Sequence, residues 1–264
     1  MITEFWKTLQ RAIYDRPLPL NSLIHKRYRI EYVLGMGSYG ITYLAQDEIT
    51  KHTVVVKQLR PSKAKIEGGL ASFEKEARIL QELEHPQVPT LLQKFHDDDG
   101  HFIVMEWIQG DTFEDLIFRD HHQYSEKETI AILLKLLTII DHFHQNGILH
   151  RDLRIPNIIE RHGKLHVVDF GLACYLTDSE DSEPPDHPEK AHMRAVTVKS
   201  DIFALGHFAL FLLYSSYVPQ SKQERSWEEE LDLSKSLQSV LRKMLQLDEP
   251  YHSIEEVRTA LKQL

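Results

Sequence analysis

Hydrophobic and polar residues alternate along the first half of the chain, whereas hydrophobic residues recur at helical spacing in the second half. Runs rich in β-branched and aromatic residues, separated by turn-prone residues, predict five strands over 28–34, 41–45, 52–59, 88–95 and 102–107. Helical spacing predicts one main helix over 72–84 and further helices over 112–118 and 126–145. We therefore expect an α+β fold with two lobes: a five-stranded antiparallel sheet with one main helix, then a mostly helical lobe.

The same pattern divides the chain into three segments. Residues 1–27 are the N-terminal segment, 28–109 the sheet lobe and 110–264 the helical lobe, because the composition changes near Gly110. Residues 2–13 predict an amphipathic helix, and the residues 16–19 that follow it, with two prolines, form an extended linker. Few basic residues lie on the polar face of this helix, so docking on the rest of the protein is favoured over a membrane surface.

Composition narrows the function classes. The 264 residues carry a formal net charge of −9, which argues against nucleic acid or an anionic membrane as partner. Cys174 is the single cysteine, so an internal disulfide is excluded and a reducing, cytoplasmic setting is expected. The longest apolar run, 202–218, is interrupted by His207 and indicates a buried core helix, so no transmembrane segment is predicted. The cluster 142–144, with two histidines, lacks the spacing of a metal site and receives no metal role.

The stretch from His150 to Gly171 carries the strongest candidate chemistry. Two short apolar runs, separated by a turn with a central glycine, predict a β-hairpin between Asn157 and Asp169. A hairpin returns the chain to its start, so these two side chains should face one cavity. A carboxylate and an amide oxygen suit Mg²⁺, which keeps water and phosphate oxygens as its other ligands. Asp152 lies five residues before Asn157 and is placed to meet a substrate hydroxyl.

A glycine-rich turn, G-x-G-x-x-G, lies between the first two predicted strands at residues 35–40. In a dinucleotide-binding fold a helix would follow the third glycine, with an acidic residue about twenty positions later. Here a β-branched and aromatic strand follows Gly40. The glycines are therefore expected to cap a hairpin whose backbone can approach phosphates closely.

Lys57 ends an apolar strand, and Glu76 lies within the apolar stripe of the predicted helix 72–84. A carboxylate on an apolar face is costly unless it is paired, and Lys57 is the natural partner. The alternatives are that Lys57 is an edge residue and that Glu76 reaches solvent at the border of the stripe.

Together, H-R-D-L-x-x-x-N at 150–157, D-F-G at 169–171, the glycine turn and S-D-I-F-A-L-G at 200–206 closely resemble eukaryotic-type (Hanks-type) protein kinases, in particular small soluble bacterial Ser/Thr kinases. The resemblance implies the kinase-like two-lobe fold and ATP and Mg²⁺ as cofactors, with the cleft between the lobes as the ligand-binding place.

The resemblance also assigns roles to residues. Lys57, held by Glu76, would fix the α- and β-phosphates, and Asp152 would accept or orient the hydroxyl proton. Arg154 stands where Ser/Thr kinases usually have Lys and would reach the γ-phosphate, which leaves the choice between Ser/Thr and Tyr open. Asn157 and Asp169 would bind Mg²⁺. The expected nucleotide-binding positions are Leu34, Gly35, Met36, Gly37, Ser38, Tyr39, Gly40, Thr42, Val55, Lys57, Met105, Glu106, Ile108 and Ile159.

Within this set, Met105 would be the gatekeeper beside the adenine, and residues 106–108 the hinge that hydrogen-bonds the base. Val55 replaces the usual alanine and would tighten the pocket roof. The apolar spine that supports the active arrangement would consist of Leu80, Leu91, His150 and Phe170.

Downstream of Gly171 the chain departs from the family pattern. Residues 172–199 should hold the activation segment, yet they lack the Ala-Pro-Glu tripeptide. The arginine that pairs with its glutamate in the family is also missing from residues 248–253, and the docking region 216–231 is short. Arg151 would bind a phosphate on the activation segment, for which the candidate acceptors are Thr177, Ser179 and Ser182. Alternatively the acidic residues Glu180, Asp181 or Glu183 supply the charge, or this stretch has no regulatory role.

The expected function is that of an ATP-dependent protein kinase that transfers the γ-phosphate to Ser/Thr hydroxyls of proteins, with autophosphorylation of the activation segment left open. One alternative is a kinase-fold enzyme acting on small-molecule hydroxyls, favoured by the missing tripeptide. The other is a pseudokinase, which would have lost at least one of Lys57, Glu76, Asp152, Asn157 and Asp169. The expected partners are a protein substrate and ATP, without nucleic acid; self-association is left open.

Overall fold

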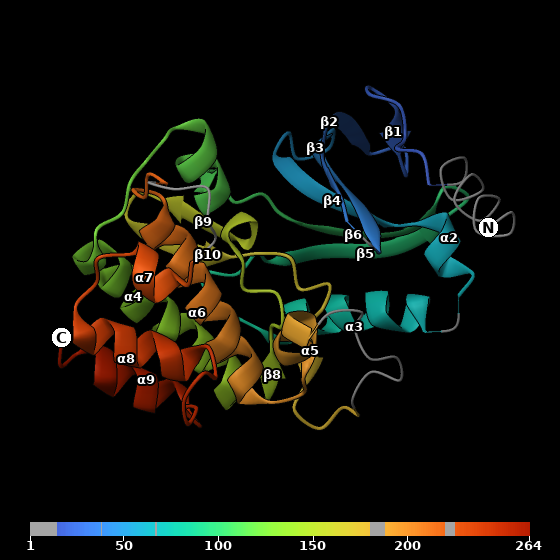
Figure 1. Cartoon of the computed structure of the whole chain (residues 1–264). Coiled ribbons are helices and arrows are strands. Elements are labelled where there is room, and N and C mark those ends of the chain that lie inside the picture. The colour runs from blue at the N-terminus through green and yellow to red at the C-terminus, as the bar shows by residue number, and fades with distance from the viewer. Residues whose placement is uncertain (1–14, 38, 67, 180–187, 220–224) are drawn as a thin grey trace, which may run out of the picture. The chain divides into compact units, whose positions relative to one another are not determined.

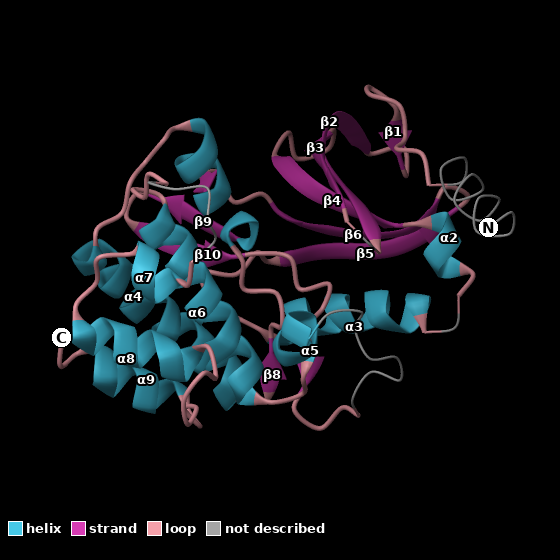
Figure 2. Ribbon diagram, in the orientation of Figure 1, coloured by secondary structure: helices cyan, strands magenta, loops and turns pink. Residues whose placement is uncertain are grey.

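The computed structural model describes residues 15–37, 39–66, 68–179, 188–219 and 225–264. The chain divides into two compact units, residues 1–108 and 109–264. Strands dominate the first unit and helices the second, as the ribbon diagrams show (Figures 1 and 2). The amphipathic helix predicted over 2–13 lies outside the described residues.

The first unit contains a six-stranded sheet in the order β1-β2-β3-β4-β6-β5, with every neighbouring pair antiparallel. Its strands are β1 (Leu23–Ile24), β2 (Tyr28–Met36), β3 (Gly40–Asp47), β4 (Thr53–Leu59), β5 (Leu91–Asp97) and β6 (Gly100–Glu106). The helices α2 (Pro61–Ala64) and α3 (Gly69–Glu82) connect β4 to β5. The predicted antiparallel sheet lobe is confirmed, although the prediction of five strands missed β1, which is too short to show an alternating pattern.

Alternation of side chains explains the sheet. Every second residue of β3 from Ile41 to Ala45 is fully buried, as are Val56 and Val104 on the neighbouring strands. Because successive side chains of a strand point to opposite faces, this pattern places one face of the sheet in an apolar core. The core cluster consists of Ile24, Tyr28, Ile30, Ile41, Tyr43, Ala45, Val54, Val56, Phe102 and Val104.

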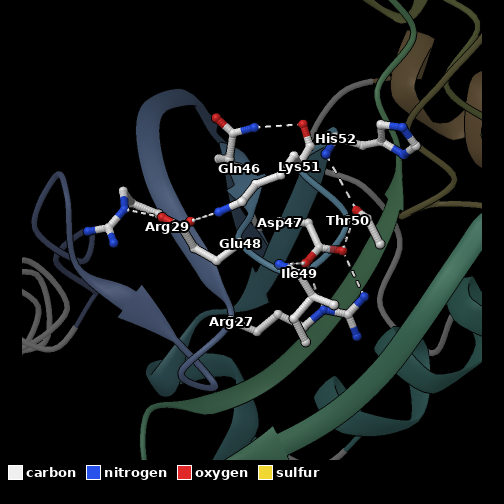
Figure 3. A network of polar contacts seen from close by, with 9 residues as sticks. All are labelled: Arg27, Arg29, Gln46, Asp47, Glu48, Ile49, Thr50, Lys51 and His52. Atoms are coloured by element: carbon white, nitrogen blue, oxygen red, sulfur yellow. Dashed lines mark hydrogen bonds and ion pairs between the residues drawn. The ribbon is translucent and has the colours of Figure 1, made fainter.

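A polar network closes the turn between β3 and β4 (Figure 3). Arg27 binds both carboxylate oxygens of Asp47, through Nε at 2.8 Å and Nη2 at 2.7 Å. The same carboxylate accepts hydrogen bonds from the amide of Ile49 and the hydroxyl of Thr50. The Arg27 guanidinium therefore holds the pKa of Asp47 below its usual range, although burial opposes the shift.

The second unit is mostly helical, as predicted. Its helices are α4 (Glu126–Gln145), α5 (Pro188–Arg194), α6 (Val198–Tyr214), α7 (Trp227–Glu230), α8 (Lys235–Met244) and α9 (Ile254–Leu261). Its short strands are β7 (Asp111–Thr112), β8 (Ile148–Leu149), β9 (Ile158–Arg161), β10 (Lys164–Val167) and β11 (Cys174–Tyr175). The predicted helix 112–118 is largely confirmed: Thr112 ends β7, and the backbone is helical from 113 to 119, with a π-helix over Asp115–Arg119.

Local sequence signals define α4. Ser125 and Glu128 form a reciprocal capping box, in which the serine side chain accepts from the amide of Glu128 and the glutamate side chain accepts from the amide of Ser125. Gly147, with φ of 69°, follows the end of the helix in the left-handed region that glycine adopts readily. The helix runs over 126–145 as predicted, and it leads directly into the segment that carries Asp152.

The core of the second unit lies between α4, α6 and α8. The apolar run at 202–218 falls largely within α6, whose buried residues include Phe208 and Leu212. A Cβ at Gly206 would lie 3.1 Å from Leu245, so α6 and the end of α8 pack closely there. Across the described residues, no helix combines the length and apolar character that crossing a bilayer would need.

We expect Asp47→Asn to lower the free energy of unfolding by about 3 kcal/mol at pH 7, near the lower limit for breaking a buried ion pair. A depressed pKa means that the ionised carboxylate favours the folded state. This contribution is complete above the ordinary aspartate pKa of about 3.9 and is lost as the pH falls below it. Urea unfolding at pH 7 and pH 3 should therefore show that the difference between wild type and variant shrinks at the lower pH.

Glu48→Gln is the matched control, because Glu48 lies beside Asp47 and pairs with Arg29 and Lys51 at the exposed side of the same turn. It should change stability little. If Asp47→Asn and Glu48→Gln lowered the free energy of unfolding equally at pH 7, the role assigned to Asp47 would be contradicted.

Candidate active site

Lys57 and Glu76 form a buried ion pair in the first unit. Lys57 lies on β4, Glu76 lies on α3, and the distance between Nζ and Oε1 is 2.6 Å. Only 7% of Lys57 and 4% of Glu76 is exposed. The apolar stripe of α3, with Phe73, Ala77 and Leu80, faces the core and carries Glu76 with it. Each charge is costly to bury alone, so the pair is stable only as a unit.

The glycine turn connects β2 and β3. Gly35 lies opposite Thr42 and Met36 opposite Ile41, so the two strands remain paired up to the turn. A Cβ at Gly40 would lie 3.1 Å from Cε of Lys57 and from the carbonyl oxygen of Gln58. A side chain at position 40 would therefore crowd the lysine side chain that runs beside it.

The other two glycines of the turn have a different surrounding. Among the described residues, a Cβ at Gly35 would meet nothing within 4 Å, and one at Gly37 only a carbonyl oxygen at 3.8 Å. Packing against the described residues does not require glycine at either position, which fits a backbone that an approaching ligand can contact closely. Leu34, just before the turn, and Met36 and Tyr39 within it have exposed side chains, and Ser38 lies outside the described residues.

The expected hinge lies at the end of the first unit. Val55 and Met105 are opposite each other on β4 and β6. Met105 and Ile108 are buried, while Glu106 is half-buried. The amide of Glu106 donates to the carbonyl of Thr90 at 2.9 Å, and its carboxylate accepts from the hydroxyl of Thr90 at 3.1 Å. Since this N–H is already used, an adenine would have to bind other backbone groups of the hinge.

In the second unit, a fully buried carboxylate holds the loop that precedes the hairpin. Asp201, in the first turn of α6, accepts the amide of His150 at 3.0 Å and the amide of Arg151 at 2.7 Å. His144, near the end of α4, contacts the same carboxylate through Nε2 at 2.9 Å. Burial alone would raise the pKa of Asp201, but its hydrogen bonds and the neighbouring imidazoles lower it below the usual range.

Asp152 is bound on both carboxylate oxygens. Arg154 donates from Nε to Oδ1 at 2.6 Å and from Nη2 to Oδ2 at 2.9 Å. Asn157 donates from Nδ2 to the carbonyl oxygen of Asp152 at 2.9 Å and to Oδ2 at 2.8 Å. From the family resemblance, Arg154 was expected to reach the γ-phosphate, whereas in the structure its guanidinium is hydrogen-bonded to the Asp152 carboxylate. The hydrogen bonds to Asp152 raise the pKa of Arg154 above its usual value.

The predicted hairpin is formed by β9 and β10. The amide of Val168 donates to the carbonyl oxygen of Asn157 at 3.0 Å, so the two ends of the hairpin meet there. Asp169 follows immediately with φ of 61°, and its Oδ1 accepts from the amide of Gly171 at 3.2 Å. The structure thus brings the backbones of Asn157 and Asp169 close together. Ile159, on β9, lies opposite both His166 and Thr112.

These groups suit a hard cation. Nδ2 of Asn157 is used in both of its bonds to Asp152, so the amide presents Oδ1, an oxygen, to any ligand. Asp169 adds a carboxylate. Within the described ranges, no group of three or more His, Cys, Asp or Glu could hold a metal on its own. One or two protein oxygens completed by water and phosphate oxygens is the coordination typical of Mg²⁺.

Phe170 fixes the position of Asp169 by packing inward. Its ring centroid lies 4.8 Å from that of His150 and 5.5 Å from that of Phe143, both in edge arrangements. The imidazole Nε2 of His150 lies 3.2 Å from the carbonyl oxygen of Val168. His150 and Phe170, two of the four expected spine residues, are therefore in contact in the second unit. Leu80 and Leu91 belong to the first unit.

Arg151 contacts the thiol of Cys174. Cys174 lies on β11, which pairs with β8, and both residues are buried. Burial raises the pKa of the Cys174 thiol, and Arg151 opposes the shift. Of the candidate phosphate acceptors, Thr177 and Ser179 are exposed. Ser182 and the acidic residues 180, 181 and 183 lie outside the described residues.

Three of these contacts were not deduced from the sequence. His144 received no role, although it continues the buried stripe of α4 that contains Leu136, Leu137 and Ile140, and this spacing was the available signal. The pairing of Arg154 with Asp152 occurs in irregular backbone, and Cys174, which Arg151 contacts, lies on the two-residue strand β11, so spacing carried no information about either contact. Near the C-terminus, Arg242 pairs with Glu228 and Asp248, both at 2.8 Å, upstream of the segment in which an arginine was sought.

Comparison with known proteins agrees with this geometry. A family model described as protein kinase domain matches residues 28–264. The probable serine/threonine-protein kinase YbdM of Bacillus subtilis (strain 168) is 37% identical over 255 residues, which cover 97% of this chain and 96% of YbdM. Serine/threonine-protein kinase PrkC of the same organism is 34% identical over 74% of this chain, and serine/threonine-protein kinase B of Synechocystis is 31% identical over 92%.

The last two relatives are longer proteins, since the matched region covers 31% of PrkC and 47% of the Synechocystis kinase. Among solved structures, the kinase domain of Mycobacterium tuberculosis PknI has a TM-score of 0.69 and 23% identity, covering 94% of this chain and 99% of that domain. This likeness establishes the two-lobe fold. The family match extends over most of the chain and includes the loop held by Asp201, so the chain belongs to the protein kinase domain family.

Proposed function

We propose that this protein is an ATP-dependent protein kinase that transfers the γ-phosphate of ATP to Ser or Thr hydroxyls of proteins, with Mg²⁺ as cofactor and in a cytoplasmic setting. The observation that carries the proposal is the cluster of Asp152, Arg154 and Asn157 beside Asp169, where the hairpin closes. The choice of Ser/Thr is supported by YbdM, whose similarity extends over almost its full length.

Phosphoryl transfer needs positioning and charge neutralisation more than covalent chemistry. The glycine turn at 35–40 presents backbone amides to the phosphates, and the ammonium of Lys57, oriented by Glu76, binds the α- and β-phosphates. Asp152 accepts the proton of the substrate hydroxyl as its oxygen attacks the γ-phosphorus and the bond to the β-phosphate oxygen breaks. Asn157 and Asp169 would hold Mg²⁺, which would supply positive charge against the phosphate oxygens.

Arg154 acts on this reaction through Asp152. Its two parallel hydrogen bonds, to Oδ1 and Oδ2 of Asp152, fix the plane of the carboxylate. Asn157 also donates to Oδ2 of Asp152. A carboxylate held in this way presents a defined lone pair to an incoming hydroxyl. Arg154 is therefore proposed as a positioning residue in addition to its expected contact with the γ-phosphate.

A second candidate is a kinase-fold enzyme that acts on a small-molecule hydroxyl. The missing Ala-Pro-Glu tripeptide and the short segment between α6 and α8, whose described part contains only the four-residue α7, favour it. The pseudokinase alternative has no such support, because Lys57, Glu76, Asp152, Asn157 and Asp169 are all present.

Incubation with γ-labelled ATP and Mg²⁺ separates these functions when a generic protein and a panel of small alcohols are offered in parallel. We expect label on serine and threonine of the protein and none on the alcohols. Phosphoamino acid analysis reads out the hydroxyl type. Label on the alcohols alone would favour the second candidate, and bound nucleotide without turnover would favour the pseudokinase.

Asp152→Asn should lower kcat by roughly 10²- to 10⁴-fold, the usual contribution of a positioned general base. The amide keeps the size of the carboxylate but cannot take the proton. Nucleotide affinity, measured with a fluorescent ATP analogue, should stay near that of wild type. Equal labelling of protein by wild type and variant would reject Asp152 as the base.

Arg154→Lys should lower kcat about three- to tenfold, because an ammonium cannot make two parallel bonds to the carboxylate. Steady-state kinetics with saturating ATP provide the measurement. Arg119→Lys is the matched control, since Arg119 is as exposed as Arg154 (55% against 56%) and also pairs with carboxylates. It should leave kcat unchanged. An Arg154→Lys variant as fast as wild type would show that the bidentate contact is not needed.

A further inference from the structure

Asp15 is a buried carboxylate that lies before the region matched by the kinase family, which begins at residue 28. Only 4% of it is exposed. Its Oδ1 accepts from the amide of Ser62 at 3.0 Å, and its Oδ2 accepts from the hydroxyl of Ser62 at 2.7 Å. Arg60 adds an ion pair at 3.6 Å. Neither Ser62 nor Arg60 belongs to the proposed catalytic residues, so the proposed reaction does not account for the burial of this carboxylate.

The segment that Asp15 binds, residues 60–63, is itself attached to the glycine turn. The amide of Arg60 donates to the carbonyl oxygen of Tyr39 at 2.9 Å. The ammonium of Lys63 lies 4.8 Å from the centroid of the Tyr39 ring, in a cation–π arrangement. Tyr39 is part of the turn whose backbone is proposed to hold the phosphates. The position of segment 60–63 therefore influences the turn directly.

The same segment is packed against the start of α3. A Cβ at Gly69 would lie 2.1 Å from the carbonyl oxygen of Lys63, so the two backbones touch and only glycine fits. A ladder of hydrogen bonds connects them, from the amide of Ile66 to Lys63 and from the amide of Gly69 to Ile66. Because α3 carries Glu76, segment 60–63 is joined to both elements of the proposed phosphate site.

Segment 60–63 cannot maintain its own geometry. Its helix, α2, has four residues and no side-chain cap among them. A helix this short is unstable without outside contacts, since one turn pays the full cost of nucleation. Asp15 provides such a contact, because it accepts from a backbone amide in the first turn of α2 and from the hydroxyl of the same residue.

A second attachment keeps Asp15 in place. The amide of Leu18 donates to the hydroxyl of Tyr43 at 3.0 Å. That hydroxyl donates to Oε1 of Gln58 at 2.8 Å, and Nε2 of Gln58 donates to the carbonyl oxygen of Asp99 at 2.8 Å. This chain of hydrogen bonds ties the residues after Asp15 to the sheet on the strands β3 and β4.

We propose that Asp15 is a positioning residue for ATP binding: it holds segment 60–63, and through it the glycine turn and the helix that carries Glu76. Asp15, which precedes the residues matched by the family model, would thereby contribute to nucleotide affinity. The link to turnover rests on the proposed function, but nucleotide binding tests the positioning separately.

The test uses the full chain with Asp15→Asn. Asparagine can still accept the hydrogen bond from the amide of Ser62 through Oδ1. It lacks the negative charge that pairs with Arg60, and it has no second carboxylate oxygen to accept from the Ser62 hydroxyl. We expect the Kd of a fluorescent ATP analogue and the KM for ATP to rise roughly three- to tenfold, the range seen for residues coupled to a site without touching its ligand. The KM for the protein substrate should not change.

Asp47→Asn is the matched control, because Asp47 is equally buried in the same unit and pairs with Arg27 at the turn between β3 and β4. It should lower stability and leave nucleotide affinity unchanged at a temperature where both variants are folded. Equal weakening of nucleotide binding by the two variants, or none by Asp15→Asn, would overturn the proposal.

Ser62→Ala keeps the test decisive if Asp15→Asn does not fold. It removes one hydrogen bond to Oδ2 and should raise the Kd of the analogue about twofold, in the same direction; no rise would count against the proposal. The wild type could bind the analogue more tightly than the Asp15→Asn and Ser62→Ala variants and still transfer no phosphate. That result would support the positioning role of Asp15 and reject the proposed kinase activity.

Discussion

The second unit depends on one buried carboxylate, Asp201. It accepts the amides of His150 and Arg151 and contacts His144, so α4, α6 and the loop before the hairpin meet on a single group. Arg151 has φ of 64°, a left-handed conformation that a residue with a side chain adopts only when surrounding contacts compensate the strain. The bond from its amide to Asp201 supplies that compensation. Asp152, the next residue, leaves the loop from this fixed point, and Arg154 and Asn157 then bind it from both sides.

The first unit contains a buried ion pair, Lys57 with Glu76, which joins β4 to α3. Burying Lys57 and Glu76 is expensive, and replacing such a pair by apolar residues of similar size is often neutral for stability or even favourable. Retention of the pair is therefore poorly explained by folding alone. Gly40 supports the same conclusion, because its missing Cβ leaves the space through which the Lys57 side chain passes. The sheet, the turn and α3 are thus arranged around the lysine that is proposed to bind the phosphates.

Much of the fold could be predicted, because long elements carry their own signals. Helix α4 has a capping box at Ser125 and a glycine after its end, and the strands β2 to β4 are rich in β-branched and aromatic residues. Strand β1 was missed, and the helix predicted over 112–118 has a π-helical geometry at 115–119 that was not predicted, since elements of two to five residues take their structure from tertiary contacts. The candidate site residues were found through motifs. The pair Asp152–Arg154 was not, because residues two apart in irregular backbone have no preferred contact that spacing could reveal.

The departures from the family pattern after Gly171 do not remove any of the proposed phosphate-transfer residues. In place of a long-range ion pair to an Ala-Pro-Glu glutamate, the end of α8 has Arg242 bound to Glu228 and Asp248, both near in sequence and partly exposed. Pairs of this kind add little stability. The C-terminal helices are instead held by apolar packing, as where Leu245 and Met244 meet α6 at Gly206. Asp201 lies on that same helix, so the loop that holds Asp152 is anchored without the missing pair. Substrate recognition can therefore diverge from the family while the phosphate-transfer groups keep their positions.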